Sequence, residues 1–176
     1  INLSNFSETL SELMFEHGNM TAKALAEQLN IAAPTLTRYL HAQRTPTVEN
    51  FVRIADYFAC STDFLLGLEQ YNPSLRFHVC PPFSERLAFL IRHYKTTCEK
   101  LCREAGIADS AFFAWKNGSK QPAMESVLKL AAHFDCRVDF ILGRETKERR
   151  RRTDCTAAAL VKKIDHVSEN RARHAC

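Results

Sequence analysis

Apolar residues recur at helical spacing from the start of the chain. Phe6, Leu10 and Leu13 fall on one side of a helix, and Gly18 with Asn19 is suited to end it. The sustained alternation of apolar and polar residues that marks strands is not found in the sequence. The pattern therefore predicts an all-α fold.

Two short helices are predicted next. Thr21 is a suitable N-cap for the first, and Asn30 suits a left-handed turn at its end. The second is predicted over residues 33–41, where a proline at an early position is tolerated. Leu36 and Leu40 should face the core, because they lie about one helical turn apart.

Two more helices complete the predicted bundle. Thr47 can cap the first of them, and a short fifth helix over residues 62–66 should stop at Gly67. The buried stripe of the fourth helix comprises apolar residues at helical spacing: Phe51, Ile54, Ala55 and Phe58.

The same pattern returns later in the chain. Phe6-Ser7-Glu8 reappears as Phe83-Ser84-Glu85, and the stretch 58–67 reappears as 134–143 with the same closing Leu-Gly. Between these stretches the copies stay in register once one residue near Asn19 is deleted. We interpret this as an internal duplication, in which each copy forms a small five-helix domain.

The repeat divides the chain into four segments. The two predicted domains span residues 1–69 and 83–145, and prolines mark residues 70–82 as a linker. Residues 146–176 are a basic tail, of which residues 157–164 are compatible with a terminal helix. The tail's arginine run could add phosphate contacts or be a frayed helix end.

Composition places the chain among soluble globular proteins. Of its 176 residues, 45% are hydrophobic and 25% are charged. No apolar run approaches the roughly 20 residues of a membrane span, and the N-terminus has no leader-like pattern. We therefore expect a cytoplasmic protein with no membrane partner. The 7 cysteines are odd in number and irregularly spaced, which favours reduced thiols.

Charge is unevenly distributed around a net value of +4. Residues 1–69 are acidic overall, whereas the segment after Glu145 is strongly basic. Charge alone would therefore not identify a nucleic-acid binder.

Several stretches closely resemble the Cro/repressor-type (XRE) helix-turn-helix family. In the first copy they are Leu25-Ala26-Glu27-Gln28-Leu29-Asn30-Ile31, Thr35-Leu36-Thr37-Arg38-Tyr39, Pro46-Thr47 and Asp63-Phe64-Leu65-Leu66-Gly67. The second copy is similar through residues 111–118 and 139–143. The resemblance implies two tandem lambda-repressor-like domains in a transcription regulator that binds double-stranded DNA. It implies no enzyme activity, cofactor or metal.

The resemblance also assigns DNA contacts in the first copy. It implies that residues 21–29 cross the phosphate backbone while residues 33–41 enter the major groove. Arg38 can make a bidentate contact with guanine, and Thr37 can touch a thymine methyl or a phosphate. The expected contact residues are Ala22, Lys23, Ala33, Pro34, Thr35, Thr37, Arg38, His41 and Arg44.

The second copy departs from this pattern. Its exposed stripe carries no cation, since the corresponding residues are Asp109, Ser110, Phe113, Ala114 and Asn117. The alternatives are weak DNA contact and a dimerisation or partner-binding role, and Phe113 is either exposed or buried. On the DNA alternative, the contact residues are Ser110, Phe113, Lys116, Asn117 and Lys120.

Other functions and partners are weighed beside this one. An interaction module, such as an antirepressor or antitoxin-like partner protein, is the alternative function, motivated by the acidic first copy and the uncharged stripe of the second. Zinc binding by Cys98 and Cys102 with His78 and Cys80 is weighed against buried thiols, which explain the cysteines more simply. Repressors of this family usually act as dimers, so a homodimer is compatible with the resemblance, as is a covalent tandem. The sequence contains no Gly-rich phosphate loop, H-E-x-x-H or G-x-S-x-G motif.

Overall fold

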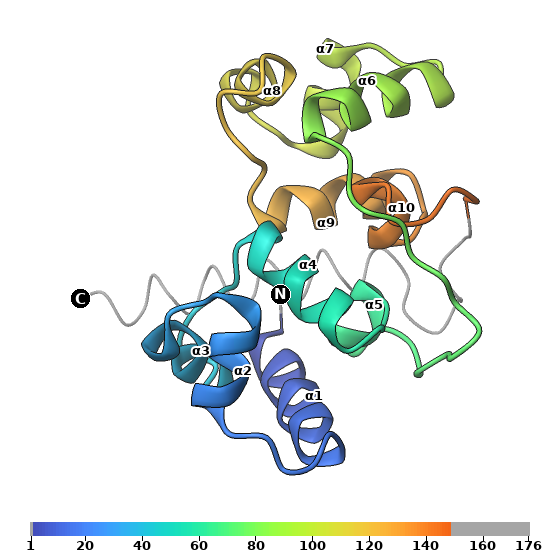
Figure 1. Ribbon diagram of the computed structural model, residues 1–176. Helices are drawn as coiled ribbons and strands as arrows, with labels where there is room; N and C mark the ends of the chain where they lie inside the picture. Colours follow the sequence, from blue (N-terminus) through green and yellow to red (C-terminus); the bar gives the residue numbers. More distant parts are fainter. Residues whose placement is uncertain (1, 149–176) are drawn as a thin grey trace. The chain divides into compact units, whose positions relative to one another are not determined.

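The chain folds into helices that group into two compact units. The structure is a computed structural model that describes residues 2–148 (Figure 1). The first unit ends at Phe77 and the second begins at His78. Within the described residues the structure contains helices and no strands, so the all-α prediction is confirmed for them.

The first unit contains five helices around one apolar core. They are α1 (Leu3–Glu16), α2 (Ala22–Leu29), α3 (Ala33–Leu40), α4 (Val48–Tyr57) and α5 (Thr62–Leu65). Helix α1 packs on α3 and α5, and α2 packs on α3 and α4. At the centre, the Phe6 ring lies 5.4 Å from the Phe51 ring and 6.1 Å from the Tyr39 ring, measured between centroids. All three side chains are almost fully buried.

Side-chain caps fix the helix ends of this unit. Thr21 Oγ1 accepts a hydrogen bond from the Ala24 amide at 3.2 Å, and Asn30 ends α2 in the left-handed conformation with φ 51°. Thr47 caps α4 in the same way. These three predictions are confirmed. Helix α1 begins earlier than the apolar pattern indicated, because the Asn2 side chain accepts from the amides of Ser4 and Asn5.

One predicted core residue of α3 is wrong. Leu36 is fully buried, but Leu40 is only half-buried, and Tyr39 fills the core in its place with 1% of its surface exposed. Tyr39 can sit there because its hydroxyl reaches a partner, accepting a hydrogen bond from Asn50 Nδ2 at 3.0 Å. Helix α3 ends at Leu40, with His41 as its C-cap.

The second unit repeats this order of helices. They are α6 (Phe83–His93), α7 (Cys98–Ala105), α8 (Asp109–Lys116), α9 (Met124–His133) and α10 (Val138–Leu142). Thr97 caps α7 through the Lys100 amide at 3.2 Å, as Thr21 caps α2. Gly106 ends α7 in the left-handed conformation that Asn30 adopts after α2.

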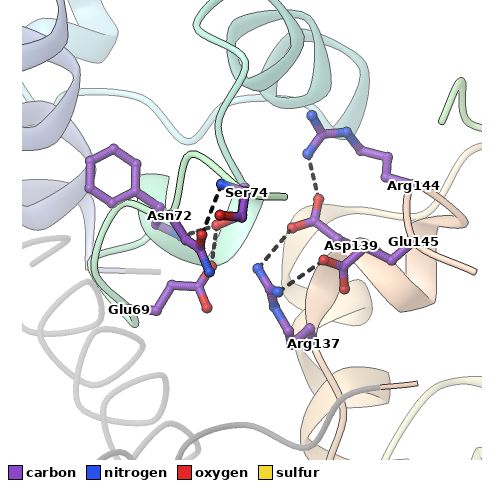
Figure 2. A network of polar contacts seen from close by, with 9 residues as sticks. Glu69, Asn72, Ser74, Arg137, Asp139, Arg144 and Glu145 are labelled. Carbon is purple, nitrogen blue, oxygen red and sulfur yellow. Dashed lines mark hydrogen bonds and ion pairs between the residues drawn. The ribbon is translucent and has the colours of Figure 1, made fainter. Parts of the chain in front are cut away.

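The polar contacts at the last helix differ between the two units. In the second unit, Arg144 pairs with Asp139, and Arg137 contacts Asp139 at 3.7 Å and Glu145 at 2.9 Å (Figure 2). In the first unit, Ser61 holds the place of Arg137. Its hydroxyl oxygen caps α5 through the Phe64 amide at 2.9 Å and donates to Glu69.

The described part of the second unit extends beyond residues 83–145 at both ends. The His78 amide donates to the Arg144 carbonyl at 2.8 Å. Glu148 accepts from the Tyr94 hydroxyl at 2.7 Å and contacts His93 Nε2 at 2.9 Å. Residues 149–176, including the stretch 157–164 and most of the predicted basic tail, lie outside the described residues.

Candidate nucleic-acid interface

Helices α2 and α3 are joined by a tight turn. After the left-handed Asn30, the Ile31 amide donates to the Ala26 carbonyl at 2.9 Å, and the Ile31 side chain is 8% exposed. Ile31 therefore fixes the turn from inside the unit. With Leu36 and Tyr39 also buried, the opposite side of α3 is left to solvent.

The exposed side of α3 carries most of the residues expected to contact DNA. Pro34, Thr37 and Arg38 are exposed, as is His41 at the helix end, while Ala33 and Thr35 are partly buried beside them. Elsewhere in the proposed site, Lys23 and Arg44 are exposed and Ala22 is partly buried.

Positive charge on this surface is not neutralised within the unit. Across residues 2–148, Lys23, Arg38 and Arg44 form no ion pair, whereas Arg53 on α4 pairs with Glu49 at 2.6 Å. The stretch 28–48 contains no carboxylate residue. The cations of α2, α3 and the following loop are therefore available to an outside anion.

Thr37 uses its hydroxyl inside the helix. Its Oγ1 donates to the Ala33 carbonyl one turn earlier, at 3.0 Å. The hydroxyl is thus engaged by the backbone, and the methyl is the group left for an apolar contact from outside.

The beginning of α2 offers backbone donors. The first amides of a helix have no acceptor within it, and the helix dipole gives that end partial positive charge. Thr21 takes up the Ala24 amide, which leaves the amides of Ala22 and Lys23 for a phosphate.

Helix α8 presents a different surface in the second unit. Its buried side comprises Phe112 and Trp115. The exposed residues that were expected to contact DNA are Ser110, Phe113, Lys116, Asn117 and Lys120. Phe113 is 70% exposed, which settles whether this ring is buried.

Asp109 at the start of α8 affects the titration of Cys102 on α7. Burial and a hydrogen bond with the Asp109 carboxylate raise the pKa of the Cys102 thiol to about 11. The thiol therefore stays protonated near neutral pH. The sequence analysis did not foresee that Asp109 lies near Cys102 of α7. Cys102 and Asp109 are seven positions apart, on either side of the α7–α8 turn, and this short separation is the signal that the sequence offered.

The loops after α3 and α8 both begin with a residue in the left-handed conformation. Ala42 adopts φ 53° after α3, and Gly118 adopts φ 72° after α8. Arg44 and Lys120 follow them at the same spacing and are both exposed.

The described residues also bear on metal binding and on membrane insertion. Among residues 2–148, no group of three or more histidine, cysteine or acidic residues is arranged to hold a metal ion. No helix in that range is both long and apolar enough to cross a membrane.

Comparisons with known proteins identify the first unit's fold. Residues 13–65 match the helix-turn-helix family, a segment that lies within the first unit and includes α2 and α3. The chain is also similar to the uncharacterized HTH-type transcriptional regulator YobD of Bacillus subtilis (strain 168), with 36% identity over 61 residues. That alignment covers 35% of this chain and 54% of YobD, so the chain matches about half of the relative's length. No solved structure matches the chain.

Proposed function

We propose that this protein is a transcription regulator that binds double-stranded DNA in a sequence-specific manner. The observation that carries the proposal is the exposed side of α3, where Arg38 forms no ion pair in the described chain and no carboxylate residue occurs from 28 to 48. The helix-turn-helix match and the similarity to a protein named as a transcriptional regulator support it.

Arg38 is the proposed base-reading residue of the first unit. Guanine displays two acceptors, O6 and N7, in the major groove, and the planar guanidinium can donate to both. Thr37 lies beside it with its methyl available. The remaining residues of the exposed side, Pro34 and His41, would lie along the same groove.

The contacts around α3 position the domain. Arg44 and the amides of Ala22 and Lys23 would bind phosphates, which carry no sequence information but set the register of the helix on the duplex. Lys120 and Lys116 would do the same for the second unit. We further propose that the two units are a tandem duplication, because their helices, caps and left-handed turns follow the same order.

Sequence selection from a random duplex library tests the proposal on the full chain. We expect the wild type to select a consensus that contains a guanine read by Arg38. Arg38→Ala should bind that consensus about 5- to 150-fold more weakly. Arg38→Lys is the matched control, because it keeps the charge and loses the planar fork. It should lose discrimination at the guanine while keeping the salt dependence of binding.

The alternative function predicts the opposite result for this selection experiment. A protein-interaction module, such as an antirepressor, is favoured by the exposed Phe113 ring. If the wild type selects no consensus and its weak duplex binding is equal for all sequences, the DNA-reading proposal fails. If a consensus is selected, a reporter with that site placed over a promoter separates repression from activation, and sedimentation shows whether a homodimer forms.

A further inference from the structure

Phe113 and Thr37 occupy corresponding places in their units. Each is the fifth residue of its helix, in α8 and in α3, and each helix follows the tight turn after a left-handed cap. The next residue is Arg38 in α3 and Ala114 in α8. The second unit therefore lacks the guanidinium and has a larger apolar group one residue earlier.

The Phe113 ring stands on the surface without support from its neighbours. It is 70% exposed, and within residues 2–148 no other aromatic ring packs on it. One turn before and one turn after Phe113 along α8 lie Asp109, Ser110, Lys116 and Asn117, none of which has an apolar side chain. Folding therefore does not explain why a phenylalanine stands there, whereas an outside apolar group would.

The surroundings of Phe113 favour an anionic partner. Residues 110–124 contain no carboxylate, and Lys116 and Lys120 in this stretch form no ion pair in the described chain. Asp109 is an exposed carboxylate one turn before Phe113, whereas Lys116 lies one turn after it. An apolar ring followed along the chain by two cations that form no ion pair in the described residues complements a surface that is apolar in one spot and anionic beside it.

The major groove of DNA offers such a surface. The thymine C5-methyl is the apolar group that base pairs display there, and phosphates line both edges of the groove. We infer that Phe113 contacts thymine methyl groups and that the second unit thereby prefers A·T pairs, while Lys116 and Lys120 contact phosphates. This inference rests on the proposed DNA-binding function.

Removal of the methyl from the DNA tests the inference directly. The probe is the consensus duplex selected by the wild-type full chain, with each thymine replaced in turn by deoxyuridine, which pairs identically and lacks the C5-methyl. Wild-type binding should weaken by about fourfold for each methyl that Phe113 contacts, as expected for one buried carbon. Phe113→Ala should bind the thymine and deoxyuridine duplexes equally at those positions.

Matched variants separate the inference from its rivals. Thr37→Ser removes only a methyl, so any thymine discrimination it loses should map to other positions than those of Phe113. Lys120→Ala should weaken binding to both duplexes equally and keep the discrimination. Phe113→Leu should retain part of it. Because Phe113 is exposed, circular dichroism of the alanine variant should match that of the wild type.

Each outcome has a distinct meaning. A wild type that selects a consensus but does not distinguish thymine from deoxyuridine overturns this inference and leaves the proposed function standing. The same holds if Phe113→Ala keeps full discrimination, in which case the ring belongs to a protein contact. A wild type that selects no duplex overturns the proposed function, and this inference falls with it.

Discussion

Helices α3 and α8 hold the same place in their units, and their exposed sides carry different chemistry. The inward positions match: Leu36 and Tyr39 in α3 correspond to Phe112 and Trp115 in α8, all buried. Outward, one helix presents Arg38 and the other presents the ring of Phe113.

This comparison shows which residues build the frame and which define its chemistry. A buried position must fill a fixed volume with an apolar group, so the two units agree there in character. An exposed position is free of that constraint. The predictions below test whether the units share a frame and differ only at the surface, from the largest expected effect to the smallest.

The largest difference between the units is expected for substitutions at their last helices, α5 and α10. Asp139→Ala would leave Arg144 buried without its carboxylate, and loss of one partner of a buried ion pair costs about 3–5 kcal/mol. Ser61→Ala in the first unit removes a helix cap and should cost about 1 kcal/mol. Hydrogen exchange of the full chain, followed for each unit, measures both.

A double variant sharpens this contrast. Replacement of Asp139 and Arg144 together by leucine removes both charges. The free energy of unfolding should therefore fall by less than the sum of the losses caused by Asp139→Leu and Arg144→Leu alone. If the two losses are additive, Asp139 and Arg144 do not stabilise α10 jointly, and packing alone holds this helix in place.

The threonine caps of α2 and α7 should contribute equally to the stability of their units. Thr21→Ala and Thr97→Ala each remove a hydroxyl that accepts from an amide at 3.2 Å, and each should lower the free energy of unfolding of its unit by about 1 kcal/mol. The matched variants Thr21→Ser and Thr97→Ser keep the acceptor and should lose much less. A large loss in only one unit would show that the shared frame is not energetically equivalent.

The smallest expected effect is on the salt dependence of duplex binding. Arg44→Ala and Lys120→Ala should each reduce the slope of log affinity against log salt by about 1, because each removes one phosphate contact. Glu8→Ala, on an exposed acidic residue of α1, is a control that should leave the slope unchanged. An unchanged slope for Lys120→Ala alone would assign phosphate contact to the first unit only.

The sequence predicts what depends on local chemistry. Helix ends could be predicted at Thr21, Asn30 and Thr47. A threonine hydroxyl accepts a hydrogen bond from an amide within a few residues, and an asparagine can adopt the left-handed turn at a helix end. The exposed side of α3 follows from the same spacing, so the exposure of Thr37 and Arg38 could be read before the structure was known.

The rest depends on polar side-chain contacts inside the units. Tyr39 displaces Leu40 from the core because Asn50, on another helix, is placed to bond its hydroxyl. The pairing of Arg144 with Asp139, five residues earlier, buries two charged side chains that the apolar pattern does not mark as part of the core. Periodicity cannot supply such information, since it records only which side of a helix is apolar.

The backbone at Ala42 has a consequence for how freely each unit tolerates mutation. Ala42 adopts the left-handed conformation, at a cost of roughly 1–2 kcal/mol for a residue with a Cβ, where the second unit has Gly118. A Cβ at Gly118 would meet nothing closer than Ser84 Oγ at 4.0 Å, so a side chain there is opposed by the backbone rather than by crowding. Replacement of Ala42 by glycine should therefore stabilise the first unit. Such a change could offset a destabilising substitution in α3, whereas the second unit already has a glycine at this position.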